Sequence, residues 1–338
     1  MSKDTFCTFV IPTRNDSYGE FSPEDFKNYL QVFVDQLSGS DRNFEINIVQ
    51  WNNIEQNPCL SELKKFIRHA ENVRINFFSV PKIFHDQILH SEKKPLCSEA
   101  AVNVGLRRAT GKFCCVKVQD AFYSSALINW LRQGTVEHGR LYRAIRADHV
   151  VQRTLGFNER DLADAEVHRY QQSGTYSTNA CGDFMLMSKD MFIRIRGWVD
   201  PGVVVSTGSD GITLARAICH GLTETLLPID FIVWKRCHPN IYRLRLGSGP
   251  PKALGAYILR IKERFRTFPP AVICHRVFLF LKIVVCGVTN LPDAEERGVP
   301  VDNFARYSLK FYFNLMFSRI HNGNSINWGL PDHEFNVH

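Results

Sequence analysis

The sequence predicts an α/β fold: a central, mainly parallel β-sheet flanked by helices, followed by a mainly helical C-terminal extension. Over residues 1–240, strand-like apolar runs alternate with runs of helical periodicity, which is typical of a parallel sheet. Several of these runs are apolar throughout, as interior strands are. Beyond residue 240 the composition changes to mixed basic and apolar residues. We therefore predict two domains, 1–240 and 241–338.

The first predicted elements are strand, helix and strand. The first strand is Phe6–Pro12, a β-favouring apolar run that ends in proline. A helix follows over Phe21–Leu37, and Ser22 and Pro23 mark its start. The second strand is Phe44–Trp51. The next expected elements are a helix over Leu60–His69, a strand over Val73–Val80 and a polar loop over Pro81–Pro95 whose histidines face solvent.

The central stretch of the sequence combines a helix, a glycine, a buried strand and an acidic residue. Ser98 is placed to cap the helix, and Gly111 to end it in the left-handed conformation. Phe113–Val118 has the composition of an interior strand, with Lys117 as its one charge. Asp120 follows at the carboxyl end, where open α/β sheets bind ligands. A carboxylate there can hold a divalent metal against a diphosphate, and an ordinary turn aspartate is an equally good interpretation.

The remaining part of the first domain continues the alternation. The expected elements are a helix over Ala126–Gln133, a strand over Leu141–Val151, a polar irregular segment over Asn158–Thr178, a strand after Asp183, a helix that begins near Asp210 and is closed by Gly221, and a strand over Ile229–Trp234.

Motifs along these elements occur in the order found in a known family. Ala101–Gly105, Ala109–Phe113 and Asp120 resemble the core A-x-N-x-G…A-x-G-x-[YF]…D, and Ala180–Leu186 resembles A-x-G-D-F-x-L. Gly208–Gly211 resembles an element with two adjacent acids. The sequence thereby resembles the family 2 glycosyltransferases, which have the GT-A (nucleotide-diphospho-sugar transferase) fold.

The resemblance implies transfer of a sugar from a nucleotide-diphosphate donor to an acceptor hydroxyl, with inversion and metal assistance. Such a reaction needs a base for the acceptor proton, neutralisation of the departing diphosphate, and exclusion of water. Asp210 would be the base, and Asp183 would share that role. The metal, manganese or magnesium, would be held by Asp120 and His238. The implied donor-binding residues are Pro12, Thr13, Arg14, Asn15, Gln50, Asn103, Gln119 and Asp120, and the implied acceptor-binding residues are Gly182, Asp183 and Trp198.

Three positions depart from the family pattern. Gln50 stands where relatives carry an acid that bonds the base or ribose, although its amide can still pair with a uracil edge. Ser209 replaces the first of the two adjacent acids, and Asp120 is a single carboxylate where relatives often show D-x-D. These departures leave a second hypothesis open: a GT-A-fold protein that binds nucleotide-sugars or glycans without catalysis. A nucleotidyltransferase is disfavoured, because no G-x-G-x-R loop follows the first strand.

Charge is concentrated in one segment. Lys235–Lys282 contains eleven Lys or Arg residues and one acid, whereas the whole chain has a net charge of +7. Within it, 242–282 is expected either to pack on the core as a helical layer or to contact an anionic membrane surface. Charged residues within its apolar part argue against a membrane span. The acceptor that the resemblance implies is a glycan or a lipid-linked molecule. Nucleic acid is not an expected partner, because no matching motif accompanies the charge.

The cysteines and the amino terminus bear on the compartment. The ten cysteines show no CxxC spacing and several lie in apolar runs, which favours reduced, buried thiols. The first residues lead directly into a strand without a secretory signal. We expect a cytoplasmic protein, or one that is peripheral on the cytosolic face of a membrane.

Overall fold

The computed structural model describes residues 4–14, 22–53, 62–63, 65–88, 91–93, 95–149, 167–171, 182–198, 209–236, 324, 328–333 and 335. These residues belong to one compact unit formed by Met1–Cys237 together with Gly323–His338. The last residues of the chain thus belong with the first domain, although the sequence analysis assigns them to the extension. The helical and membrane-binding character expected for 242–282 lies outside the described residues.

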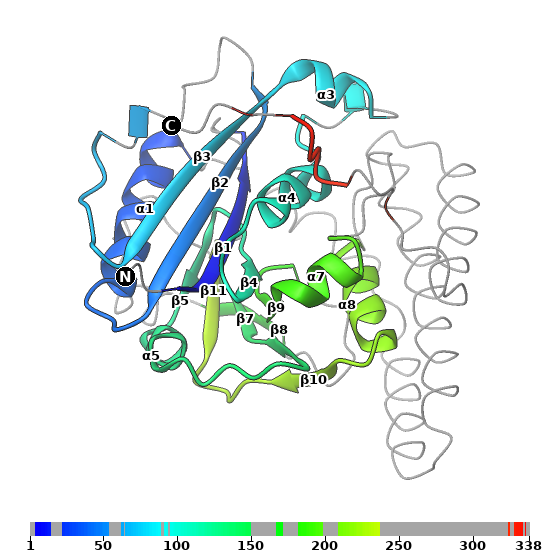
Figure 1. The fold of residues 1–338 in the computed structure, drawn as a ribbon. Coiled ribbons are helices and arrows are strands. Elements are labelled where there is room, and N and C mark those ends of the chain that lie inside the picture. Colours follow the sequence, from blue (N-terminus) through cyan, green and yellow to red (C-terminus); the bar gives the residue numbers. More distant parts are fainter. Residues whose placement is uncertain are drawn as a thin grey trace. The chain divides into compact units, whose positions relative to one another are not determined.

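A seven-stranded sheet forms the centre of this unit (Figure 1). Its strands, in spatial order, are β10 (Thr223–Leu226), β6 (Arg140–Arg143), β9 (Met185–Ser188), β4 (Phe113–Val116), β1 (Thr5–Thr13), β2 (Asn43–Asn53) and β3 (Val73–Pro81). Every neighbouring pair is parallel except those of β9, which runs antiparallel to both β4 and β6. The predicted α/β class with a mainly parallel sheet is confirmed.

A second, four-stranded sheet lies beside the carboxyl end of β4. Its order is β5 (Ala121–Tyr123), β11 (Ile232–Arg236), β7 (Ile145–His149) and β8 (Val167–Gln171). The strand predicted over Leu141–Val151 is divided by Ala144 into β6 and β7, which belong to different sheets. The segment predicted to be irregular, Asn158–Thr178, contains β8. Pairing with β7 stabilises this short polar strand, and single-sequence periodicity does not report such a partner.

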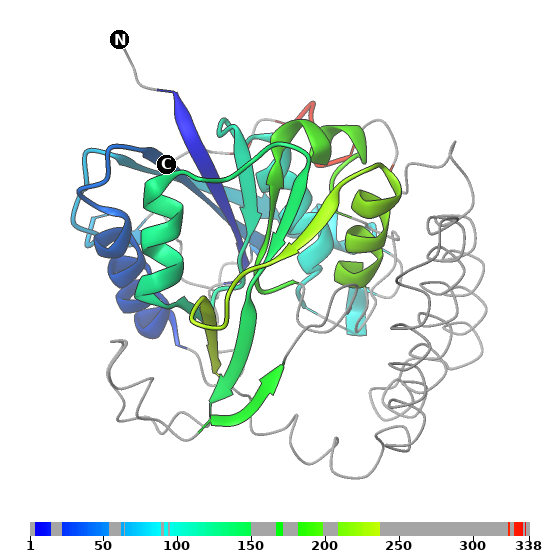
Figure 2. The same ribbon diagram turned by 90° about the horizontal axis from the view of Figure 1, so that it is seen from below.

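Helices cover both faces of the main sheet (Figure 2). Helices α1 (Pro23–Leu37) and α5 (Ser125–Gln133) pack on one face, and α4 (Ser98–Arg107), α7 (Lys189–Arg194) and α8 (Ser209–Cys219) pack on the other. Because side chains alternate along a strand, Phe9 and Ile11 of β1 join the core under α1, whereas Val10 joins the core under α4. The predicted start of α1 is confirmed by a capping box between Ser22 and Asp25.

The ends of α4 differ from the prediction. Cys97 is its N-cap residue, so Ser98 is already helical, and the helix ends at Arg108 in the right-handed conformation. Gly111 does not have a positive φ. Instead, a Cβ at Gly111 would lie 2.6 Å from the backbone nitrogen of Thr8. Glycine is therefore needed here for close contact between the α4–β4 loop and β1 rather than for a left-handed turn.

Two further local predictions were wrong. The segment Pro81–Pro95 contains the helix α3 (Lys82–Asp86) and a 3₁₀ turn, Ser91–Lys93. His85 is buried and not solvent-facing: its Nδ1 accepts a hydrogen bond from Trp51 Nε1 at 2.9 Å. The helix predicted over Leu60–His69 lies partly outside the described residues, and residues 62–63 are its only helical positions within them.

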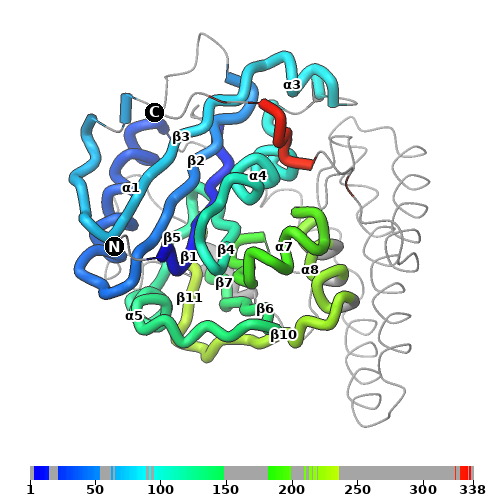
Figure 3. Tube along the Cα trace, in the orientation of Figure 1, coloured from blue at the N-terminus to red at the C-terminus, as the bar shows by residue number. Residues whose placement is uncertain are grey.

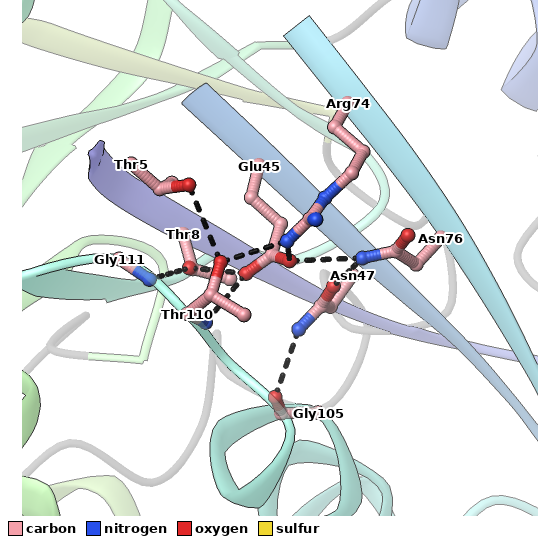
Figure 4. Close-up of polar contacts among 9 residues, drawn as sticks. All are labelled: Thr5, Thr8, Glu45, Asn47, Arg74, Asn76, Gly105, Thr110 and Gly111. Atoms are coloured by element: carbon pink, nitrogen blue, oxygen red, sulfur yellow. Dashed lines mark hydrogen bonds and ion pairs between the residues drawn. The ribbon is translucent and has the colours of Figure 1, made fainter. Parts of the chain in front are cut away.

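A buried polar network fixes the α4–β4 loop on the sheet (Figure 4). Glu45 of β2 lies at its centre and accepts hydrogen bonds from Thr8 Oγ1 at 2.6 Å and from the backbone nitrogen of Thr110 at 2.8 Å. Asn76 Nδ2 donates to the same carboxylate at 2.9 Å, and Arg74 adds an ion pair. A buried carboxylate requires such partners, and here they come from three separate segments: β1, β3 and the α4–β4 loop.

The end of the chain packs against α4 (Figure 3). The Arg108 guanidinium donates to the carbonyl oxygens of Gly329, Leu330 and His333 at 2.6–2.8 Å. Trp328 is buried, with the guanidinium of Arg107 5.0 Å from its ring centroid. In the described part of the chain, no helix has the length and apolar character required to cross a membrane.

Candidate functional site

Two of the predicted aspartates meet at the carboxyl edge of β4. Asp120 lies in the turn that follows β4, and Asp183 lies just before β9. Because β9 is antiparallel to β4, with Met185 opposite Val116, the start of β9 lies at the edge where β4 ends. Strand direction therefore places two carboxylates at one edge, although 63 positions separate them in the sequence.

The second sheet adds two cations to this pair. Lys235 of β11 pairs with Ala121, the residue after Asp120. Its Nζ lies 2.9 Å from Asp183 Oδ1 and 3.6 Å from Asp120 Oδ1. Arg146 of β7 lies on the neighbouring strand, and its Nη1 is 2.5 Å from Asp183 Oδ2. We call these four side chains, Asp120, Asp183, Lys235 and Arg146, the edge cluster.

The edge cluster is strongly coupled. Burial alone would raise the pKa of Asp183, but Lys235 and Arg146 hold it below its ordinary value. Burial would lower the pKa of Lys235, but Asp120 and Asp183 raise it to about 12. Asp183 is thus a carboxylate and Lys235 an ammonium at neutral pH. A carboxylate held in this state is a weak proton acceptor, which reduces the suitability of Asp183 as a general base.

A second lysine, Lys117, lies beneath the cluster. Lys117, fully buried, donates to the carbonyl oxygen of Ala121, which also accepts a hydrogen bond from Tyr29. The Lys117 Nζ lies 4.1 Å from the centroid of the Tyr123 ring and 4.6 Å from that of Tyr29. Burial holds the pKa of Lys117 well below its ordinary value. These bonds fix the turn that carries Asp120.

Asp210, the predicted base, lies at the start of α8. Its Oδ2 accepts a hydrogen bond from the backbone nitrogen of Gly182 at 3.1 Å, which places it beside the residue that precedes Asp183. The adjacent Ser209 donates to the buried carboxylate of Glu99 at 2.8 Å. Ser209 replaces an acid of the motif that this segment resembles, and its hydroxyl is bonded to a carboxylate from α4.

The predicted donor-binding residues occupy several positions. Thr13 and Gln50 lie opposite each other at the carboxyl ends of β1 and β2, and both are buried. Pro12 precedes Thr13 on β1, and Arg14 and Gln119 are half-buried. Asn15 and His238 lie outside the described residues.

Asn103 and Trp198 make contact with each other. Asn103 Nδ2 donates to the Trp198 carbonyl oxygen at 2.8 Å, and its Oδ1 accepts from the Trp198 nitrogen at 2.7 Å. The Trp198 side chain is buried, and its Nε1 donates to Ser209 Oγ at 3.4 Å. These bonds join α4 to the segment before α8. Contacts of the two side chains with donor and acceptor stay predictions.

The described residues do not fit the divalent metal that the resemblance implies. Among them, no group of three or more His, Cys, Asp or Glu side chains is placed to hold a metal ion. One carboxylate and phosphate oxygens are sufficient in principle, but Asp120 already faces the Lys235 ammonium at 3.6 Å. A divalent cation on the same carboxylate would be repelled by that ammonium. We therefore derive no step through a metal.

Sequence reasoning missed the cationic half of the site. In the sequence, Lys235 counts only toward a basic segment, and Arg146 is one residue of the predicted strand Leu141–Val151. Lys117 gives a signal, since it is the one charge in an otherwise apolar strand run. Lys235 directly follows the apolar residues Ile232–Trp234, but its partners come from other strands.

Comparisons with known proteins give structural alignments at low sequence identity. No known family profile matches the sequence, and no curated protein matches it. Among solved structures, Staphylococcus aureus TarS 1-349 in complex with UDP aligns with a TM-score of 0.45 and 12% identity over 93% of this chain and 91% of that chain. TarS 1-349 aligns with a TM-score of 0.44 and 12% identity, covering 94% and 95%. TarS aligns with a TM-score of 0.45 and 10% identity, covering 93% of this chain and 55% of its own.

Proposed function

We propose that this protein has a GT-A-like fold and transfers a sugar, with inversion, from a nucleotide-diphosphate donor to an acceptor hydroxyl. One observation carries the proposal. Asp120, Asp183 and Asp210, which the motif resemblance assigns to this reaction, are linked at one end of the sheet through Lys235 and the backbone of Gly182. Side chains 27 and 63 positions apart are brought together by the fold in the way that an active site requires.

The geometry favours Asp210 over Asp183 as the base. Asp183 is held by two cations, which lowers its affinity for a proton. Asp210 is half-buried, and it accepts a hydrogen bond from the backbone nitrogen of Gly182, the residue before Asp183. In the proposed step, Asp210 takes the acceptor proton, and Asp183 orients Lys235 and Arg146.

A binding protein without catalysis is the second candidate. It is favoured by Ser209 and Gln50, which replace acidic residues of the family pattern. This protein would hold a nucleotide-sugar or glycan at the same edge, and it would leave the glycosidic bond intact.

A screen of nucleotide-sugars distinguishes the two candidates. UDP-sugars come first, because the Gln50 amide can pair with a uracil edge. Release of nucleoside diphosphate is measured with and without manganese and with a panel of glycan and lipid-linked acceptors, alongside thermal stabilisation. Turnover that is lost in Asp120→Asn but kept in Asp190→Asn, a change at an exposed aspartate of α7, supports the transferase. Stabilisation without turnover for every pair supports the binding protein instead.

A further inference from the structure

Resting on the proposed function, we propose that Lys235 and Arg146 form a metal-independent binding site for the donor diphosphate, and that Asp120 and Asp183 hold these two cations in position. The resemblance gives the aspartates the roles of metal ligand and base. In this chain the aspartates face two cations of the protein itself, Lys235 and Arg146.

The exposure of the edge cluster supports this inference. The side chains of Asp120 and Asp183 are each 6% exposed, whereas those of Lys235 and Arg146 are 19% and 16% exposed. The carboxylates thus lie on the inner side of the cluster and the cations reach solvent. Such a surface is suited to an anion, because an incoming phosphate meets donor groups first.

The positions of the cations support it as well. Both lie in the second sheet, on adjacent parallel strands, and Lys235 pairs with Ala121 directly after the Asp120 turn. Ligands of open α/β sheets bind outside the carboxyl ends of the strands, and this is where the ammonium and guanidinium lie. Each cation is held by a carboxylate at 2.5–2.9 Å, which fixes it before any ligand binds.

The role of the two cations in the reaction follows from charge. As the bond between the anomeric carbon and the diphosphate oxygen breaks, the diphosphate keeps the electron pair and gains negative charge. The acceptor oxygen forms the new bond to the anomeric carbon, and its proton passes to Asp210. Lys235 and Arg146 stabilise the charge on the leaving diphosphate, which is the task that a divalent metal performs in other transferases.

Titration calorimetry on the full chain tests the inference with a panel of nucleoside diphosphates and inorganic pyrophosphate, in EDTA and in manganese. We expect the wild-type protein to bind at least one nucleoside diphosphate in EDTA, with a Kd within about threefold of that in manganese. In EDTA, Lys235→Gln should weaken binding by about 10- to 100-fold, the usual effect of losing a charge-assisted hydrogen bond. Manganese should restore binding in this variant. Without the Lys235 ammonium, Asp120 and Asp183 no longer face a charge that repels a divalent cation.

Two further variants complete the experiment. Lys112→Gln removes an exposed lysine at the opposite end of β4 and should bind as the wild type does. Lys235→Arg keeps the charge and should retain binding in EDTA, which covers the case in which Lys235→Gln does not fold.

The outcomes separate this inference from the proposed function. Binding by the wild type that requires manganese overturns the inference and leaves the transferase proposal intact. Unchanged binding by folded Lys235→Gln in EDTA also overturns it. Pyrophosphate binding without any nucleotide binding supports the anion site and contradicts the transferase. Absence of binding by every ligand in both conditions contradicts both.

Discussion

The side chain of Asp210 decides whether the site performs the proposed chemistry. We expect Asp210→Asn to lower turnover by about 100-fold or more, because a positioned general base contributes at least that factor. Donor binding should be nearly unchanged, since the proposed diphosphate site consists of Lys235 and Arg146. Steady-state kinetics with a matched donor and acceptor, together with donor titration, measures both effects.

The Asp210→Asn variant distinguishes a catalytic role of Asp210 from a purely structural one. Its amide oxygen can still accept the hydrogen bond from Gly182, which Asp210 accepts at 3.1 Å. Asparagine is also nearly as good as aspartate at a helix start. If Asp210 were only structural, the variant would be a nearly normal enzyme. Wild-type turnover by the folded variant would remove Asp210 from the mechanism.

Lys117 makes stability depend on pH. Its pKa in the folded protein is lowered by burial, with a smaller effect from Lys235, whereas Asp120 and Asp183 act in the opposite direction. An unfolded lysine titrates near pH ~10.4, so the unfolded chain binds more protons in the window between the lowered pKa and that value. Stability must therefore rise with pH across this window, by up to about 1.4 kcal/mol per pH unit.

Lys117→Met should remove this rise. Urea unfolding of the wild type and the variant at several pH values between 6 and 9 compares the two, and contributions from other titrating groups cancel in the difference. The free-energy difference, wild type minus variant, should increase with pH. The exposed control Lys112→Met should follow the wild type. Parallel curves for Lys117→Met and the wild type would show that Lys117 folds in its charged form.

At the scale of elements, the network around Glu45 fixes the loop that leads into β4. Its carboxylate accepts bonds from β1, from β3 and from the α4–β4 loop. We expect Glu45→Gln to lower the free energy of unfolding by about 1–3 kcal/mol, because the new amide group turns a donor toward other donors. Urea unfolding measures the change.

An exposed glutamate provides the matched control for that experiment. Glu62→Gln changes only a solvent-exposed pair with Lys65, and it should stay within about 0.5 kcal/mol of the wild type. Equal stability of Glu45→Gln and Glu62→Gln would contradict the role given to the network.

The elements were predictable where local pattern and burial agree. β1, α1 and β2 follow from apolar runs and a start signal within each element, and the structure has all three. The division at Ala144 and the strand β8 were not predictable, because each depends on a partner strand distant in the chain. The reason for glycine at position 111 was not predictable either, because it depends on close contact with the backbone of Thr8, which is distant in the chain.

At the scale of the whole molecule, the carboxylates of the candidate site were predictable and the cations were not. Asp120, Asp183 and Asp210 each belong to a motif that can be recognised from residues near it in the sequence. Lys235 and Arg146 join them through the second sheet, whose strand order is set by tertiary pairing. The chemical character of the edge cluster therefore emerges only from the fold.

The proposed function requires a nucleotide-sugar to bind at the carboxyl edge of β4. Hydrogen exchange of the full chain, with and without a saturating nucleotide-sugar identified in the screen, measures this binding at the level of single segments. We expect slower exchange in the turn before β5, at residues 117–121, and at 182–184 before β9. The opposite edge of the main sheet, at residues 5–8 of β1 and at 110–112 before β4, should exchange as before. Protection confined to that opposite edge, or saturating binding with unchanged exchange at both turns, would contradict the account.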